Sequence, residues 1–331
     1  MVRPVLSSPA FSSSALALAA LAAPPAQGAQ FASSVSAYAM GNVFTASGAT
    51  YSDTSRATGA PHPIVDEGQF YQASLNPYNP HWETTQLTAI GRGGSITLQY
   101  AQPMVVGAGH EIGVFTSASL GDADFDGVVD SPVKTFAGDE YGAERTAVVE
   151  VAGPDGNFVS LGRVIFDKPT NYYSNVPGPY VDPATFSGIV ADFDKPFTAD
   201  LSVFEGKNFS QVIAALEGSA GGTWIDVPTD AGLTQISFVR FSDTMWRTAD
   251  GSLVETRSSR FDASYVKPAD LFIDAVAVVP EPGAAGAGVV LAAGALLRRR
   301  RGCRGLYSGQ VHPRGWSSRG TPRDIVLKVL H

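Results

Sequence analysis

Glycine and proline divide this chain into short segments that are rich in β-branched and aromatic residues. The 331 residues include 35 glycines and 22 prolines. The segments between them favour apolar and polar alternation over the 3.6-residue periodicity of helices, which is typical of strands. The sequence therefore predicts an all-β fold. The clearest strands are expected at residues 95–100, 111–116, 146–151, 157–166, 234–241 and 271–278.

A tight hairpin is predicted at Pro154-Asp155-Gly156-Asn157, because Asp-Gly tolerates the positive φ angles of such turns. Within the strand at 234–241, side chains alternate between two faces. We expect Ile236, Phe238 and Arg240 on one face and Ser237, Val239 and Phe241 on the other. Such a strand would be covered, at least partly, on both faces. Residues 29–92 are less regular and are expected to supply an edge strand and surface loops.

One segment has helical periodicity. Its apolar residues, at i, i+3, i+4 and i+7, are Phe209, Val212, Ile213 and Leu216. Asn208 can cap the N-terminus, and Gly218 follows the end. We expect one short helix, without a catalytic role, over an end or edge of a jelly-roll-like β-sandwich.

The N-terminal residues 1–28 have the pattern of a signal peptide. Arg3 is followed by an Ala/Leu-rich run and then by small residues up to Gly28, with cleavage expected near Ala29. The alternative, a buried helix, would have to explain Pro24-Pro25 directly after the apolar run.

The charge of the chain is distributed unevenly. Residues 29–297 contain 13 basic and 30 acidic residues, a net charge of −17. Such a body repels nucleic acid, so we expect no nucleic-acid partner. The single cysteine, Cys303, lies beyond this region, which therefore cannot form an internal disulfide.

A three-part signal follows the last predicted strand. Val279, Pro280, Glu281 and Pro282 precede an uncharged apolar run of about 15 residues, 283–297, which is shorter than the roughly 20 residues of a full membrane span. The run ends with four arginines, Arg298, Arg299, Arg300 and Arg301. The arginines would stay on the cytoplasmic side of the membrane during export.

This order of motif, apolar helix and basic cluster resembles the PEP-CTERM sorting domain of Gram-negative bacteria. The resemblance implies recognition by an exosortase-type enzyme in cells that make exopolysaccharide, with a transmembrane sorting helix before processing. A plain membrane anchor and a buried helix are the alternatives. The chain departs from the family in its polar, basic tail at 302–331, which we expect to be disordered. The predicted organisation is thus a signal peptide (1–28), an exported β-sandwich (29–278), a sorting segment (279–301) and the tail.

The exported region itself resembles discoidin-like or galactose-binding-like jelly rolls of bacterial surface proteins. The segments that carry this resemblance are 93–98, 112–115, 149–151 and 156–161. They imply a fold and no particular ligand.

An acidic loop at 122–130 has the spacing of a calcium-binding loop. Asp122, Asp124, Asp126 and Asp130 occupy positions 1, 3, 5 and 9, with Gly127 at the turn, and the Val128 carbonyl is the expected backbone ligand. Position 12 is Val133 rather than an acid, so Asp139, Glu140, a carbonyl or water would complete the shell. The alternative is a solvated acidic turn. We favour Ca²⁺ because close carboxylates repel one another unless a cation offsets them.

Aromatic residues in loops are the second candidate site. Tyr78, Trp82, Tyr172 and Tyr173 are candidates for stacking on sugar rings, although packing is the commoner role of such rings. No recognisable catalytic motif is present in the sequence. The sequence therefore predicts a non-enzymatic protein of the outer cell surface or extracellular matrix, with a structural or carbohydrate-binding role. The alternatives are a glycoside-active hydrolase or lyase and a protein-binding adhesion module.

Overall fold

The computed structural model describes most of the region between the two predicted terminal signals. The described residues are 28–43, 50–65, 72–107, 109–122, 126–130, 144–182, 184–248, 250–258 and 266–279. The predicted signal peptide, the sorting segment from Pro280 onward and the basic tail lie outside these residues. Within the described part of the chain, no helix is long and apolar enough to cross a membrane.

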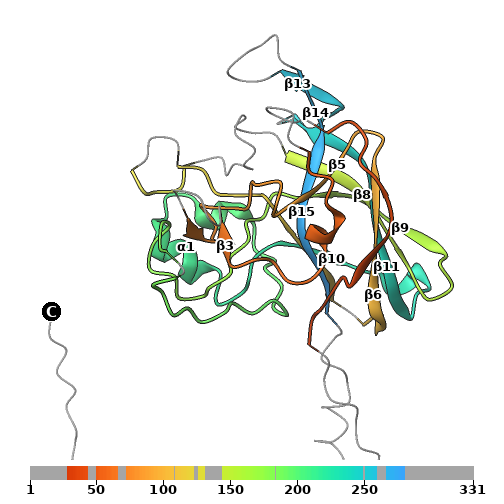
Figure 1. The fold of residues 1–331 in the computed structure, drawn as a ribbon, viewed down its shortest axis with the longest axis horizontal. Helices are drawn as coiled ribbons and strands as arrows, with labels where there is room; N and C mark the ends of the chain where they lie inside the picture. Colours follow the sequence, from red (N-terminus) through yellow and green to blue (C-terminus); the bar gives the residue numbers. More distant parts are fainter. Residues whose placement is uncertain are drawn as a thin grey trace, which may run out of the picture. The chain divides into compact units, whose positions relative to one another are not determined.

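The described strands form two larger sheets in which every pairing is antiparallel (Figure 1). The five-stranded sheet has the order β1 (Gln30–Phe31), β15 (Asp270–Val278), β7 (His110–Thr116) and β10 (Thr223–Asp226), and β5 (Thr88–Gly91) also pairs with β15. The six-stranded sheet has the order β2 (Ser34–Ala39), β6 (Ser95–Val105), β11 (Gln235–Arg247), β8 (Glu144–Ala152) and β9 (Phe158–Ile165), and β12 (Leu253–Val254) pairs with β11.

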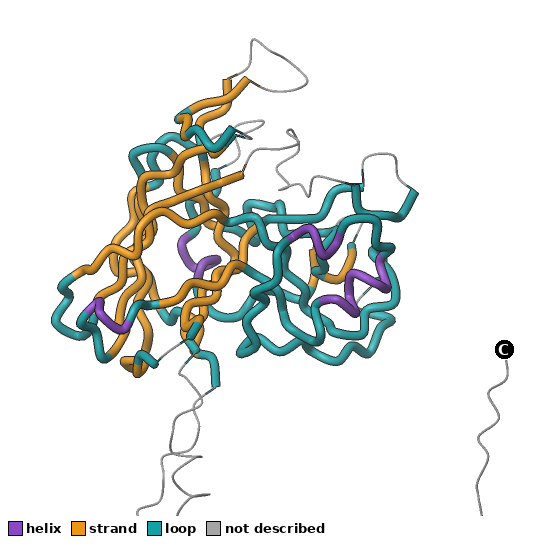
Figure 2. The backbone as a smooth tube through the Cα atoms, turned by 180° about the vertical axis from the view of Figure 1, so that it is seen from behind, coloured by secondary structure: helices purple, strands orange, loops and turns teal. Residues whose placement is uncertain are grey.

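Smaller elements complete the described fold. Two short hairpins pair β3 (Ile64–Val65) with β4 (Ala73–Ser74), and β13 (Thr256–Ser258) with β14 (Val266–Pro268). The single-turn helices are η2 (Thr54–Ala57), η3 (Leu201–Phe204) and η4 (Thr229–Ala231). Figure 2 shows most of the strands on one side of this region and mostly loops on the other, with helical turns on both sides.

Side chains from both large sheets form one hydrophobic core. Its members include Ile90, Ile96, Leu98, Ile112, Val114, Val149, Val239, Phe241, Leu271 and Val276. Two antiparallel sheets that share a core have the arrangement of a β-sandwich. The mostly-β prediction is therefore confirmed, and each of the six expected strands overlaps an observed one.

The strand β15 is buried along its whole length because both of its faces are covered. Ile273 and Val276 lie in the core between the sheets, whereas Ala275 belongs to a second cluster on the other face. The register shifts between Ile273 and Ala275. Such a bulge interrupts the alternation and redirects the side chain that it contains, here Asp274.

The predicted helix is present as α1 (Phe209–Ala215). The Asn208 side chain accepts a hydrogen bond from the Gln211 amide, and the Gln211 side chain accepts one from the Asn208 amide, which completes a capping box. Val212 and Leu216 lie in the second hydrophobic cluster together with Trp224 of the edge strand β10. Local sequence signals thus determine where the helix begins, and packing of its apolar side chains holds it against the rest of the fold.

The predicted hairpin joins β8 to β9. Gly156 has a φ of +73°, and its amide donates to the Gly153 carbonyl at 3.1 Å. The expected edge strand in the N-terminal region is also confirmed, since β2 forms one edge of the six-stranded sheet.

The expected alternation along β11 was wrong at its start. Ile236, Val239 and Phe241 all lie in the core, whereas the ring of Phe238 lies 6.5 Å from that of Phe158 on β9. The cause is a register shift against β6 between Ile236 and Phe238. Ile236 therefore does not share a face with Phe238, because an irregularity in pairing reverses the order of the faces.

Candidate ligand pocket at Asp274

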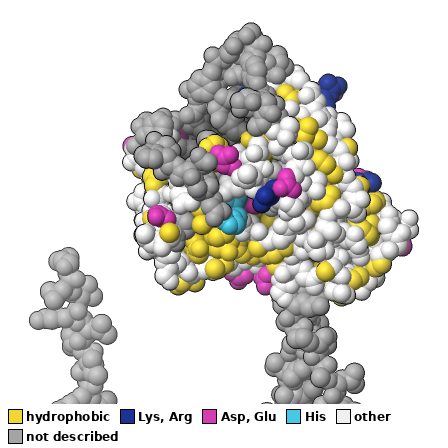
Figure 3. All heavy atoms as spheres, viewed as in Figure 1, with side chains coloured by type: hydrophobic (Ala, Val, Ile, Leu, Met, Phe, Trp, Pro, Cys, Tyr) yellow, Lys and Arg dark blue, Asp and Glu magenta, His cyan; other side chains and the backbone are white. Residues whose placement is uncertain are grey.

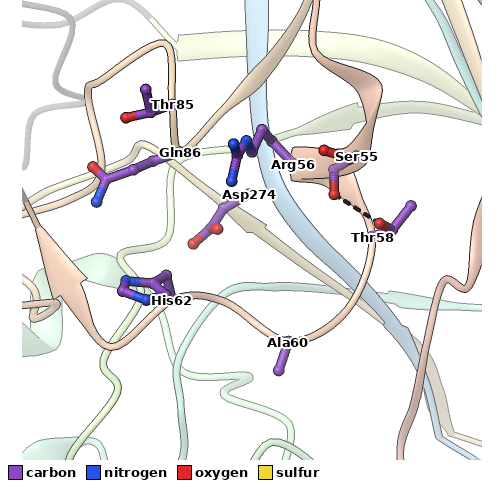
Figure 4. Close-up of a pocket in the computed structure, with 8 residues that line it drawn as sticks. All are labelled: Ser55, Arg56, Thr58, Ala60, His62, Thr85, Gln86 and Asp274. Carbon is purple, nitrogen blue, oxygen red and sulfur yellow. Dashed lines mark hydrogen bonds between the residues drawn. The ribbon is translucent and has the colours of Figure 1, made fainter. Parts of the chain in front are cut away.

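A polar pocket of about 470 Å³ lies where the N-terminal loops meet β15 (Figure 4). Its lining residues are Ser55, Arg56, Thr58, Ala60, His62, Thr85, Gln86 and Asp274. They come from η2 and the loop after it, from the segment before β5, and from β15. Ser55, Arg56, His62 and Thr85 are exposed, whereas Gln86 and Asp274 are buried, so the last two form the inner part of the pocket.

The helical turn η2 positions one wall through Asp53. The Asp53 carboxylate accepts hydrogen bonds from the Ser55 amide at 3.1 Å, from the Ser55 hydroxyl at 2.6 Å and from Arg56 Nε at 3.0 Å. Hydrogen bonds from Ser55 and the charge of Arg56 hold the pKa of Asp53 below its ordinary value. Ala57 of the same turn is buried in the core between the sheets, which anchors this wall to the sandwich.

Asp274 is the buried charge of the pocket, with only 3% of the residue exposed. Its Oδ2 lies 2.8 Å from Nδ1 of His81, which is itself 1% exposed. The cost of burying a carboxylate is high unless a partner compensates the charge, and His81 provides that partner. Figure 4 shows the Asp274 carboxylate pointing between Gln86 and His62.

The His81 ring is held between two oxygen atoms. Nδ1 faces the Asp274 carboxylate, and Nε2 lies 3.2 Å from the Ile64 carbonyl oxygen. Both neighbours are oxygen atoms that can accept a hydrogen bond, so the two contacts fix the orientation of the ring. Gln86 Nε2 donates to the same Ile64 carbonyl at 2.6 Å and so fixes the second inner residue of the pocket.

Two acceptor atoms of the inner wall have no protein donor among the described residues. One is Oδ1 of Asp274, whose neighbour Oδ2 is engaged by His81. The other is Oε1 of Gln86. Buried acceptors are normally satisfied by protein, water or ligand. The arrangement can therefore accept hydrogen bonds from a molecule that enters the pocket.

The acidic loop predicted to bind calcium lies elsewhere, beside α1. The Asp122 carboxylate accepts the amides of Asp126 at 3.1 Å and Gly127 at 2.8 Å, so the chain turns sharply around position 1. Val128 pairs with Asn208, the residue that caps α1, and the amide of Asp130 donates to the Gly121 carbonyl. Asp124 lies outside the described residues. Within them, no three acidic, histidine or cysteine side chains converge as a metal site would require.

Three of the four candidate aromatic residues lie near one another, since Tyr78 and Tyr173 both pack against the cluster of Val176, Phe209 and Ile213. Tyr78 packs against Phe209 of α1 at 5.4 Å, Tyr172 lies 4.8 Å from Tyr173, and all three tyrosines are half-buried. Burial, with added repulsion from Asp122 and Asp126, raises the pKa of Tyr78 to about 12. Trp82 is apart from them in the packing: it is 45% exposed, and its carbonyl accepts the Tyr51 hydroxyl.

Of the sorting residues, only Val279 lies in the described part, where its amide donates to the Glu111 carbonyl at 2.7 Å. Pro280, Glu281, Pro282 and the arginines at 298–301 lie outside it. The sheet therefore ends directly before the motif.

Sequence reasoning missed the pocket residues. Arg56, His62 and Gln86 belong to no motif, and their proximity to Asp274 depends on the tertiary fold. Asp274 itself carried a signal, because it is a carboxylate within the otherwise apolar strand 271–278. A charge in a buried strand requires a compensating partner, which points to a specific environment.

No protein-family model matches this chain, and no curated protein matches its sequence.

Proposed function

We propose that this chain is an exported protein of the bacterial cell surface or extracellular matrix whose jelly-roll-like sandwich binds a small polar ligand in the Asp274 pocket. The observation that supports binding is the carboxylate of Asp274, which is only 3% exposed and keeps one oxygen without a donor among the described residues. A small-molecule site usually has a volume of about 300–1,000 Å³ and a few convergent polar groups. The pocket has both.

Binding can be tested without knowing the ligand. The full chain would be screened by thermal unfolding against a mixed panel of sugars, amino acids and small organic ions, using Asp155→Asn on the β8–β9 turn as control. Ligands of the pocket should raise the unfolding temperature of the wild type and the control, but not that of Arg56→Gln. Binding that Arg56→Gln leaves intact would contradict the proposal.

Export and sorting are supported by the sequence. The signal-peptide pattern at 1–28 and the motif with its apolar run and arginines frame the region that folds. An exosortase-type enzyme would recognise the C-terminal segment while it lies in the membrane, and the exopolysaccharide matrix is the proposed destination.

The sorting proposal can be tested by mass spectrometry of the mature protein from cells with and without the sorting enzyme. We expect a C-terminus near Pro282 only when the enzyme is present. An unchanged C-terminus at His331 in both strains would refute processing.

Calcium at the acidic loop is a separate proposal. The turn at Gly127, with φ of +85°, and the two amides that bind Asp122 fit the first half of a calcium loop. Asp122, Asp124, Asp126, Asp130 and the Val128 carbonyl would hold the ion. Calorimetry of the full chain should show calcium binding that Asp124→Ala and Asp126→Ala abolish and Asp155→Ala retains. The absence of calcium-dependent heat in the wild type would end the proposal.

The alternatives differ in what they require. A glycoside-active enzyme needs two convergent carboxylates, and Asp274 is the one carboxylate among the described lining residues. An adhesion module needs exposed apolar surface, and Ile189 and Val190 are 65% and 54% exposed. These two neighbours favour adhesion as the second candidate function.

A further inference from the structure

The charges around the Asp274 pocket come in two pairs of opposite sign. Arg56 lies 3.0 Å from Asp53, and His81 lies 2.8 Å from Asp274. Each pair places a basic side chain next to an acidic one. The described charged groups of the pocket are therefore mixed in sign, within a region that carries a net charge of −17. Figure 3 likewise shows charged side chains standing singly or in opposite pairs on the face viewed, with no patch of one sign.

Two of the three hydroxyl groups of the pocket wall already donate hydrogen bonds within the protein. The Ser55 hydroxyl donates to Asp53 at 2.6 Å, and the Thr58 hydroxyl donates to the Ser55 carbonyl at 2.7 Å. Each of these oxygens can still accept a hydrogen bond, in addition to Oδ1 of Asp274. The pocket thus offers both kinds of group: acceptor oxygens on its walls, and donors in the Thr85 hydroxyl and the N–H groups of Arg56 that do not contact Asp53.

This combination limits the chemistry of a ligand. An anion brings only acceptors, and it would meet the acceptor oxygens of Asp274, Ser55 and Thr58. A cation would bring donors, but it would lie close to the positive charge of Arg56. A hydroxyl-rich neutral molecule brings many donors and no charge, and its oxygens can also accept from Arg56.

We infer that the pocket binds a neutral polyhydroxylated molecule, a monosaccharide or sugar alcohol, through hydroxyl groups that donate to Asp274 and accept from Arg56. This inference rests on the proposed binding function and specifies its ligand. The site differs from the aromatic candidates because recognition depends on hydrogen bonds rather than on stacking: Ala60 is the only non-polar residue among those that line the pocket in the described structure. His81 acts as a positioning residue that holds the Asp274 carboxylate in place.

The test is a calorimetric titration of the full chain with three classes of probe. Glucose, mannose and mannitol are neutral, glucuronate is anionic and glucosamine is cationic. We expect at least one neutral probe to bind, and we expect Asp274→Asn to weaken its binding about tenfold or more, because a hydrogen bond to a charged group is lost. Arg56→Gln, at an exposed position, should weaken binding without unfolding the protein, and Asp155→Asn should leave it unchanged.

The outcomes separate this inference from the function on which it rests. Binding of glucuronate or glucosamine at the pocket, without any neutral probe, would overturn the inference and leave the binding function standing. Failure of every probe, in this titration and in the wider screen, would overturn both. If Asp274→Asn does not fold, the comparison of Arg56→Gln with Asp155→Asn decides the question, and equal affinities would refute the inference.

Discussion

At the scale of single residues, three carboxylates that are wholly or partly buried have different surroundings. Asp274 pairs with His81, and Asp270 lies 3.3 Å from Arg145. Asp167 is different: burial, followed by repulsion from Glu144, raises its pKa to about 6. A carboxyl group that is easier to protonate in the folded state than in the unfolded chain makes stability depend on pH.

Replacing Asp167 with asparagine should therefore stabilise the protein at neutral pH. The folded pKa of about 6 lies above the ordinary value of an aspartate, about 4, so the contribution of Asp167 is fully present below about pH 4 and is lost as the pH rises through about 6. A shift of this size corresponds to at most about 3 kcal/mol. Urea unfolding from pH 4 to pH 8 would measure it. Asp167→Asn should flatten the decline, while Asp230→Asn at an exposed position should not, and equal pH profiles for both would contradict the assignment.

Residue contacts also show what the sequence could predict. The strand at 271–278 was predictable because nearly all of its consecutive residues are apolar. The partnership of Asp274 with His81 was not, because the two residues are 193 positions apart and a bulge decides where Asp274 points. Local patterns specify which side chains are buried in a strand, whereas the meeting of distant loops depends on the whole fold. The acidic loop stays a prediction, since Asp124 lies outside the described residues.

At the scale of elements, α1 depends on its capping box. The helix has seven residues, too few to be stable in isolation, so each terminal hydrogen bond matters. Asn208→Ala removes the side chain that accepts the Gln211 amide and should cost about 1 kcal/mol of unfolding free energy. Chemical denaturation would measure this loss. Asn42→Ala, at an exposed position outside any helix, is the control, and an equal effect at both sites would argue against capping.

The packing of β7 against β10 leads to a paired glycine experiment. Gly222 has a φ of +75°, and a Cβ there would lie 2.8 Å from the ring of Phe115. Gly206 has a φ of +65°, but a Cβ there would have nothing within 4 Å of it. Gly206→Ala should cost about 1–2 kcal/mol from backbone strain alone. Gly222→Ala should cost about 1–3 kcal/mol more because of overpacking. Equal losses in denaturant titrations would show that the close contact has no energetic role.

At the scale of the whole molecule, the acidity of the region between the terminal signals should reduce its stability. A net charge of −17 within residues 29–297 repels itself in the compact state. Salt weakens this repulsion, because the Debye length, the distance over which charges interact, falls from about 30 Å at 0.01 M salt to about 10 Å at 0.1 M. The sequence contains one cysteine, Cys303, so no internal disulfide offsets this repulsion.

We therefore expect the thermal unfolding midpoint of the full chain to rise by several degrees between about 10 mM and about 300 mM NaCl, because added salt screens the repulsion. EDTA would be present throughout to exclude divalent cations. Tetramethylammonium chloride should give the same rise if the cause is screening. A midpoint that falls or stays constant in both salts would show that self-repulsion is unimportant.

The position of β15 in the sheet also bears on how the protein is made. This strand pairs with β1, β5 and β7, yet it is the last strand of the described fold and ends one residue before Val279. The centre of the sheet is therefore synthesised last, and a nascent chain that stops before Asp270 has strands that flank an absent neighbour. In the exported protein that we propose, the sandwich can close only after almost the whole chain has been translocated. The final strand and the sorting segment would then both be completed at the end of synthesis. Truncated products would lack both.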